Sequence, residues 1–449
     1  MITRIEIDGF KSFQEFSLDL APFQVIIGPN GCGKSNLFDA IHFLSLLADK
    51  PVNEALQSLR GEARDLFTIL PDGTRAKQMR FAVEMRVPPT VTDAWGDTEE
   101  LEDTHLRYEL EIPYGDSAIM QSGITASEKL ISISASDIDS RQAKEPHIGP
   151  RMISLYGDNR DMHLISFAPV TRSGKVHKPR DSTGHYYIPS TSLSKMDKVD
   201  LPYPLVVRQE MQSWRQFNPL PVYLRQSSTT LDTPFLTSDG KNLAAALARM
   251  EQESPASLND VSRDLTNIMR SSFHVGLDKD EKNDRITVYV KNKAGHQFPA
   301  RVLSDGTLRL LALATIRNDP AFRGTLCFED PETGAHPGGL RKIADILRDT
   351  TVPFDLEDAN EPQRQVLVTT HSTDFISHLN LPDELLYAEM PLRIEPGVGS
   401  SQVTRISPVG VEGETDKANS SYTLSRVIEY LTNADIETKR EELCEAWRK

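Results

Sequence analysis

The sequence predicts an α/β protein with a mixed core sheet, an antiparallel side sheet and a helical lobe. An apolar strand at Phe23–Ile27 leads through a glycine-rich loop into a segment with the 3.6-residue periodicity of a helix. Two short apolar segments, at residues 326–328 and 366–368, run into polar residues that a core strand would carry at its end. Segments 79–87 and 106–112 alternate apolar and polar residues, which indicates antiparallel strands with one buried face.

The composition is that of a globular chain. It has 449 residues, 38% of them hydrophobic, which suffices for two or three compact units. It has no apolar run of about 18 residues and no signal-peptide pattern, so we expect a cytoplasmic protein without a membrane partner. Three widely spaced cysteines favour reduced thiols over disulfides or a zinc cluster. A formal net charge of -15 argues against nucleic-acid binding over the whole surface but leaves room for a local basic patch.

Four segments are expected along the chain: two parts of one split unit, a middle segment rich in turn signals, and a helical tail. The split unit comprises residues 1–126 and 235–390. The middle segment comprises residues 127–234, and the helical tail comprises residues 391–449. The second part is predicted to hold helices over residues 240–250 and 258–273, then a hairpin that turns near Ala294 and Gly295. The chain lacks a heptad run long enough for a coiled-coil arm.

The glycine-rich loop has the pattern Gly28-x-x-x-x-Gly33-Lys34-Ser35 between a strand and a helix. In this context the backbone N–H groups of such a loop turn inward around phosphates. Lys34 is expected to reach the β and γ phosphates, and the Ser35 hydroxyl to ligate magnesium. The sequence therefore predicts a nucleotide site with Mg²⁺, in preference to a turn that only starts a helix.

Acidic and basic side chains follow the two later apolar strands. Glu329 and Asp330 follow the first, where one carboxylate could hold magnesium and the next could deprotonate an attacking water. His371 follows the second, where it could contact a γ phosphate or that water. The alternatives are a solvated acidic turn and a structural histidine.

A third polar group stands before an apolar helix at residues 308–316. Ser304, Asp305, Gly306 and Thr307 open this helix, with Ser304 or Asp305 as its cap. A helix start of this kind is an anion-binding surface, so it could meet a phosphate. Most such starts are ordinary caps, and that alternative stays open here.

In combination these motifs resemble a known family. The chain carries "GFKSF", "GPNGCGKSN", "LSDGT", "FEDPETGAHP" and "TTHSTDF" in this order, which is similar to the ATP-binding-cassette (ABC) ATPases of the SMC, RecF and OLD type. The resemblance covers residues 1 to about 125 and about 235 to 380. It implies an ABC-ATPase head, a P-loop NTPase, with ATP and Mg²⁺ as cofactors and with two heads that bury ATP between them in a homodimer or higher homo-oligomer.

The resemblance also implies roles for single residues. Asp330, Glu329 and His371 would be catalytic, with Ser35 and Glu329 at the metal. The nucleotide would be bound by Lys11, Asn30, Gly31, Cys32, Gly33, Lys34, Ser35 and Asn36 of one head and by Ser304, Asp305 and Gly306 of the other. Lys11 could instead be a solvated lysine on an edge strand.

Two departures from the family pattern matter. The signature reads "LSDGT" where transporters have "LSGGQ", a change that resembles the OLD-type branch. The usual Asp-Glu order is reversed as Glu329-Asp330, so the shorter carboxylate stands at the base position and hydrolysis is expected to be slow. Glu332 is a possible substitute base.

Three functions compete. The favoured one is an ATPase that senses or regulates, resembling the stand-alone ATPases of bacterial anti-phage defence that work beside a separate effector, a nuclease or toxin. The others are an ATP-dependent oligomeric scaffold with little hydrolysis and a RecF-like DNA-repair clamp. For DNA contact the chain offers the basic segment 172–180, followed by Tyr186 and Tyr187. A nuclease domain is not expected within the chain, because the pairs Asp137/Asp139 and Asp278/Asp280 both precede His371.

Overall fold

The computed structural model describes residues 1–114, 127–133, 151–152, 191, 193–269, 271–354, 362–381, 383–409 and 427. Three predictions lie outside these residues: the basic segment 172–180 with its tyrosines, the pair Asp137/Asp139, and the helical tail at residues 410–426 and 428–449. Within the described part of the chain, no helix combines the length and the apolar character needed to cross a membrane.

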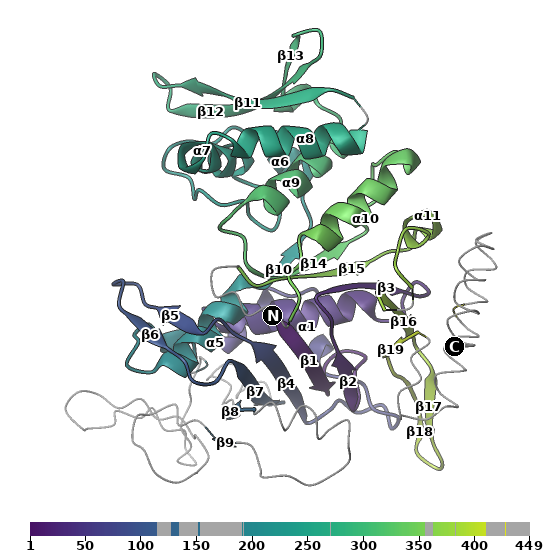
Figure 1. Ribbon diagram of the computed structural model, residues 1–449. Coiled ribbons are helices and arrows are strands. Elements are labelled where there is room, and N and C mark those ends of the chain that lie inside the picture. The colour runs from purple at the N-terminus through teal and green to yellow at the C-terminus, as the bar shows by residue number, and fades with distance from the viewer. Residues whose placement is uncertain are drawn as a thin grey trace.

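A six-stranded mixed sheet forms the centre of the molecule, between a helical lobe and an antiparallel sheet (Figure 1). Its strand order is β10-β14-β15-β3-β16-β19, and only β19 runs antiparallel to its neighbour. The strands are β3 (Phe23–Ile27), β10 (Arg215–Phe217), β14 (Gly324–Glu329), β15 (Arg364–Thr369), β16 (Leu385–Glu389) and β19 (Arg405–Pro408). The three predicted core strands are β3, β14 and β15, which lie side by side.

Alternate side chains of the central sheet enter two different cores. Ile26, Cys327 and Leu367 pack in one core with α1 (Lys34–Leu47), α2 (Val52–Gln57) and α5 (Pro202–Ser213). Val25 and Val368 pack in the other with the helical lobe. Because successive side chains of a strand point to opposite faces, the apolar strands are buried on both sides and read as continuous apolar runs.

The predicted antiparallel strands lie in a six-stranded side sheet of order β2-β1-β4-β7-β8-β9. Its strands are β1 (Ile2–Asp8), β2 (Phe16–Asp19), β4 (Gln78–Arg86), β7 (His105–Pro113), β8 (Ser127–Ser132) and β9 (Arg151–Met152). The connection between β4 and β7 contains a two-stranded hairpin of β5 (Thr90–Thr92) and β6 (Thr98–Glu100).

The helical lobe contains both predicted helices and the predicted hairpin. The helices are α7 (Leu243–Glu253) and α8 (Ser257–Met269), and the hairpin consists of β12 (Arg285–Asn292) and β13 (Gln297–Pro299). A further strand that was not expected, β11 (Phe273–Asp280), pairs with β12 and completes a three-stranded sheet. The lobe also holds α6 (Pro221–Leu224), α9 (Asp305–Asn318) and α10 (Leu340–Asp349). The strands β11 to β13 lie over α7 and α8 at the end of the molecule farthest from the side sheet (Figure 1).

Short elements complete the described chain. They are the 3-10 turns at Ala63–Leu66, Leu193–Lys195, Ala300–Val302 and Pro337–Gly339, the helix α11 (Thr373–Ile376), and the hairpin of β17 (Leu392–Glu395) and β18 (Gly399–Gln402). The expectation of a helical tail from residue 391 is wrong for residues 391–409, which hold β17, β18 and β19 instead. The residues between β18 and β19 contact the phosphate loop, as described below.

Candidate nucleotide-binding site

The predicted phosphate loop connects β3 to α1. Its crest, Asn30 and Gly31, is exposed, whereas Cys32, Gly33 and Lys34 are buried. Gly33 has a φ of 98°, and a Cβ built there would lie 2.0 Å from the Thr404 hydroxyl oxygen. Only glycine fits both the left-handed backbone and this contact, so position 33 sets the curvature of the loop.

Lys34 points back under the crest of the loop. Its Nζ donates hydrogen bonds to the carbonyl oxygens of Gly28 at 2.8 Å and Pro29 at 3.0 Å. Burial lowers the pKa of Lys34, and the nearby carboxylates of Asp330 and Glu329 oppose that shift. The buried lysine charge is therefore held within electrostatic reach of both acidic residues.

Residues far apart in the sequence hold the loop in place. The Thr404 hydroxyl donates to the Cys32 carbonyl oxygen at 3.0 Å and lies 2.6 Å from the Ser12 hydroxyl. Ser12 in turn accepts a hydrogen bond of 2.8 Å from the Asn36 side-chain amide. Burial raises the pKa of the Cys32 thiol, which favours a neutral sulfur inside the loop. The loop is thus tied both to the turn after β1 and to the segment before β19.

A charged network at the side of the loop contains two residues that the sequence analysis missed. Lys11 lies in the turn between β1 and β2, with a φ of 48°, and its Nζ donates to Asp39 at 2.5 Å. The alternative placement of Lys11 on an edge strand is wrong. Arg60 donates to the second oxygen of Asp39 at 3.1 Å and lies 3.9 Å from Glu329. Asp39 could have been recognised from the sequence, because it is a carboxylate on the apolar face of α1, where it is buried.

The acidic pair lies where β14 ends. Glu329 is the last residue of the strand, and its Oε1 accepts no hydrogen bond from the described residues. Asp330 has a φ of 44°, and its N–H donates to the Thr369 carbonyl oxygen of β15 at 2.8 Å. A non-glycine residue in the left-handed region costs backbone energy and is often found where function requires a fixed direction of the side chain.

Glu332 and His371 flank the acidic pair. The Thr370 hydroxyl donates to Glu332 Oε1 at 2.5 Å, whereas Glu332 Oε2 is buried without a hydrogen bond from a described residue. Burial raises the pKa of Glu332, and Asp330 adds to the shift. Burial lowers the pKa of His371, and the Lys34 charge lowers it further while Asp330 opposes this. His371 therefore faces the site as a neutral imidazole near neutral pH.

The sheet order brings these groups together. Strands β14, β15 and β3 are adjacent and parallel, so their carboxyl ends deliver Glu329, His371 and the phosphate loop to one edge. Among the described residues, no group of three or more His, Cys, Asp or Glu side chains could hold a metal ion. The residues fit a Mg²⁺ ion that takes Ser35 and Glu329 as its protein contacts, because Mg²⁺ bound with a nucleotide keeps water and phosphate oxygens as its remaining ligands.

The signature residues lie apart, at the start of α9 in the helical lobe (Figure 1). Ser304 is the N-cap, as predicted, and its hydroxyl accepts a hydrogen bond of 3.2 Å from the Thr307 N–H. A Cβ at Gly306 would lie 2.0 Å from the Gly334 carbonyl oxygen, so the start of α9 packs against the loop that follows Asp330. The hydrogen bonds of Asp280, in contrast, go to Asn283 and Lys282 in a turn, which explains its lowered pKa without a metal.

Comparison with known families gives two matches. The family described as "AAA domain, putative AbiEii toxin, Type IV TA system" matches residues 98–377, and the family described as "RecF/RecN/SMC N terminal domain" matches residues 1–83. The two matches together include the phosphate loop, the signature, the acidic pair and His371.

Similar proteins match over short stretches. Chromosome partition protein Smc of Bordetella petrii is 36% identical over 86 residues, which make up 19% of this chain and 7% of Smc. DNA replication and repair protein RecF of Lactobacillus johnsonii is 28% identical over 95 residues, or 21% of this chain and 25% of RecF. Thus the chain matches a quarter or less of the length of these relatives.

One similar solved structure extends over most of the chain. The crystal structure of the SmcHead bound to the C-winged helix domain of ScpA has a TM-score of 0.51 and 14% identity, covering 90% of this chain and 98% of that one. At this identity the likeness concerns the fold alone.

Proposed function

Because the chain belongs to the family described as "AAA domain, putative AbiEii toxin, Type IV TA system" and is an SMC/RecF-like ABC ATPase, we propose that it binds and hydrolyses ATP between two associated heads. The observation that carries this proposal is the convergence of the phosphate loop, Glu329, Asp330 and His371 at one edge of the central sheet. ATP and water would give ADP and phosphate at this edge.

Each group has a role that follows from its position. The ammonium group of Lys34 would exchange the loop carbonyls for phosphate oxygens, because its hydrogen bonds to Gly28 and Pro29 hold it beneath the loop. Magnesium, held through Ser35 and Glu329, would neutralise phosphate charge. The Asp330 carboxylate would accept a proton from the attacking water, and the neutral His371 would orient that water or the γ phosphate.

A second copy of the chain would complete the site. Ser304 to Thr307 contact their own helix and the loop at Gly334, in the helical lobe rather than at the phosphate loop. The N-terminus of α9 carries partial positive charge, and Ser304 is exposed there, so this helix start is suited to meet the triphosphate of another head. This geometry supports a homodimer or larger homo-oligomer that forms around ATP.

We assign this head a sensing or regulatory role in bacterial anti-phage defence, beside a separate effector protein, a nuclease or toxin. Two features support the assignment. The matched family is described by a toxin of a toxin–antitoxin system, and the chain has no coiled-coil pattern of the kind that gives SMC proteins their length. A cytoplasmic location would suit this role.

One observation favours the alternative of an ATP-dependent scaffold with little hydrolysis. Asp330 has a shorter side chain than the glutamate that the family pattern has at this position, and its backbone at φ 44° leaves it little freedom to extend its reach. A RecF-like clamp has less support, because the net charge of -15 opposes DNA binding outside a local patch.

ATP turnover and oligomeric mass, measured together, test the proposal. We expect the native chain to release phosphate, Asp330→Ala to lose release by about 10²-fold or more while keeping an ATP-dependent larger species, and Lys34→Ala to lose both. Glu329→Ala should lose release and the magnesium dependence of binding. A native chain that assembles with ATP but releases no phosphate would support the scaffold. A native chain that neither binds ATP nor assembles would contradict both the ATPase and the scaffold.

A further inference from the structure

The signature of this chain contains a negative charge at the place proposed to meet a triphosphate. Asp305 is the first residue of α9, and its side chain is 68% exposed. A carboxylate at a helix N-terminus stabilises the helix, but it repels a phosphate that approaches the same N–H groups. The structure must compensate this charge if a second head is to bring ATP to α9.

Arg225, the residue after α6, meets this need. Its Nη2 donates to Asp305 Oδ1 at 2.6 Å and to the Leu303 carbonyl oxygen at 2.9 Å. The first bond neutralises the carboxylate, and the second fixes the backbone just before the signature serine. One guanidinium therefore holds both the charge and the shape of the Leu303–Asp305 turn.

The segment that carries Arg225 is anchored within the helical lobe and not by the nucleotide site. Ser228, three residues further on, exchanges two backbone hydrogen bonds with Ile286 of β12, at 3.0 and 2.7 Å. At the other end of α6, the Leu220 N–H donates to the Asp239 carbonyl oxygen at 2.8 Å. Arg225 thus reaches the signature from a support that is fixed on both sides.

We infer that Arg225 is a positioning residue for head association: by pairing with Asp305 and the Leu303 carbonyl, it makes the LSDGT turn able to accept the triphosphate bound to a second copy of this chain. The inference rests on the proposed function and adds a residue to it. It also gives a reason for the aspartate where transporters have glycine, since the chain supplies the matching cation 80 residues earlier.

The test is a double-mutant cycle with ATP-dependent association as its readout. It uses the full chain with Arg225→Ala, Asp305→Ala, and both changes together, measured by sedimentation with ATP and Mg²⁺. We expect Arg225→Ala to weaken association by about five- to tenfold, because a homodimer would contain this exposed ion pair at both ATP sites and each pair contributes only a little. Asp305→Ala in the Arg225→Ala background should restore most of the loss, because the unpaired carboxylate is gone.

Two measurements and two further variants separate this effect from a general loss of structure. ATP binding to the dilute single head should stay within about twofold in all variants, because Arg225 is remote from the phosphate loop of its own chain. Melting temperature identifies a folding defect, and Arg225→Lys keeps the charge if alanine unfolds the lobe. Arg285→Ala is the matched control, since this arginine donates its hydrogen bond of 2.9 Å to the Ser227 hydroxyl rather than to the signature.

The outcomes are distinct. A native chain that does not associate with ATP would overturn the proposed function and this inference together. If the native chain associates and Arg225→Ala associates equally well, only the inference fails. If Arg225→Ala weakens association but Asp305→Ala gives no rescue, the charge-pairing role is also wrong, because the arginine then acts without its partner.

Discussion

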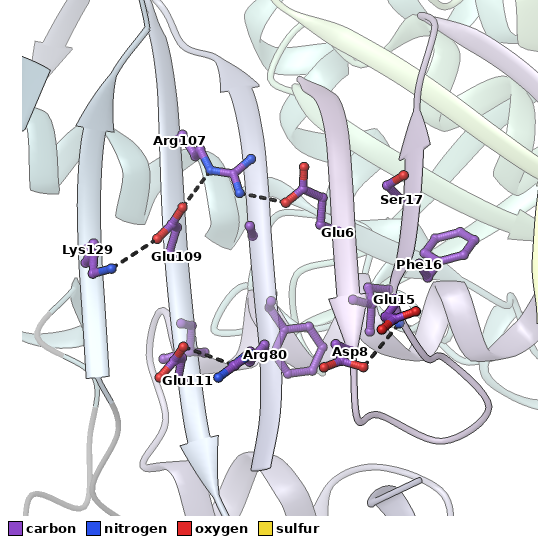
Figure 2. Close-up of a pocket in the computed structure, with 14 residues that line it drawn as sticks. Glu6, Asp8, Glu15, Phe16, Ser17, Arg80, Arg107, Glu109, Glu111 and Lys129 are labelled. Carbon is purple, nitrogen blue, oxygen red and sulfur yellow. Dashed lines mark hydrogen bonds and ion pairs between the residues drawn. The ribbon is translucent and has the colours of Figure 1, made fainter. Parts of the chain in front are cut away.

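Two regions of the molecule carry many charged residues, and they differ in how fully these residues are paired with one another. The outward face of the side sheet surrounds a hollow of about 490 Å³, shown in Figure 2, with charged side chains from β1, β4, β7 and β8. The carboxyl edge of the central sheet carries Lys34, Glu329, Asp330 and Glu332. A hollow of this size, lined by charged side chains, could be taken for a ligand site.

The hydrogen bonds reverse that judgement. On the side sheet, Arg107 donates to Glu6 at 2.6 Å and to Glu109 at 2.8 Å (Figure 2). It also donates to Glu84 at 2.9 Å, so one guanidinium binds three carboxylates. Lys129 adds an ion pair with Glu109 at 3.6 Å. Because these charged groups are already paired with one another, they would bind a charged ligand only weakly. We therefore interpret this network as a structural feature of the sheet.

At the central sheet, in contrast, carboxylate oxygens are buried without a hydrogen bond from the described residues. Glu329 Oε1 and Glu332 Oε2 accept no hydrogen bond there, Asp330 has a strained backbone, and burial lowers the pKa of Lys34. Such features cost stability and persist where function requires them. The comparison teaches that unsatisfied polar groups identify this site better than the volume of a hollow.

The largest expected effect comes from the phosphate loop, where Gly33→Ala should weaken ATP binding by about a hundredfold or more. The added Cβ would lie 2.0 Å from the Thr404 hydroxyl oxygen, on a backbone at φ 98°. The loop must then move away from Thr404, and its backbone N–H groups would no longer point toward the phosphates. Titration with a fluorescent ATP analogue measures the change.

Gly31→Ala is the matched control, because Gly31 also has a positive φ, 79°, but a Cβ there meets nothing within 4 Å. This change should cost only the backbone strain, about 1 kcal/mol. Thr404→Gly, which removes the clashing atoms, should recover part of the loss in Gly33→Ala. Equal losses in the two glycine variants would show that strain, and not the contact with Thr404, limits the loop.

A smaller effect is expected at Glu332, and it decides which carboxylate is the base. Glu332→Gln should keep at least about a tenth of the phosphate release, whereas Asp330→Ala should lose nearly all of it. Loss of release in Glu332→Gln as complete as in Asp330→Ala would make Glu332 the base. Turnover of the two variants at saturating ATP is the measurement.

Stability gives a second readout for Glu332. Burial raises its pKa above the ordinary value of 4.5, so its folded-state penalty is absent below the unfolded pKa and grows as the pH rises through the folded pKa. Glu332→Gln should therefore be more stable than the native chain near pH 7, by up to about 1 kcal/mol, and equally stable near pH 4. Urea unfolding at the two pH values tests this.

How much of this was predictable depends on how local each signal is. The phosphate loop, strands β3, β14 and β15 and the Ser304 cap follow from short patterns, and the predicted ABC-ATPase head fold is confirmed. The three-residue strand β10 has no run of apolar residues to reveal it, and its place beside β14 depends on tertiary contacts.

Ion pairs between distant residues could not be predicted. Arg60 and Asp39 are 21 residues apart and Arg225 and Asp305 are 80 apart, and one sequence offers no means of pairing them. The geometry brings Lys34, Glu329, Asp330 and His371 to one edge, but their catalytic roles stay predictions, as do the domain boundaries at residues 126, 234 and 390.

The smallest effect belongs to the side sheet and completes the comparison. Partial burial would raise the pKa of Glu6, but hydrogen bonds from Arg107 and Arg4 lower it from 4.5 to about 2. A depressed pKa contributes stability above the unfolded value, and this stability is lost as the pH falls toward the folded value. Glu6→Gln should therefore lower the free energy of unfolding by about 1 kcal/mol at pH 7, since solvent screens a partly exposed pair, and this cost should disappear between pH 4.5 and 2.

ATP turnover of Glu6→Gln at pH 7 should be unchanged, because Glu6 lies on the sheet face of Figure 2 and not at the phosphate loop. A loss of turnover in a stable Glu6→Gln protein would instead mean that the paired charges of the side sheet act on the nucleotide site, and the contrast between the two regions would fail.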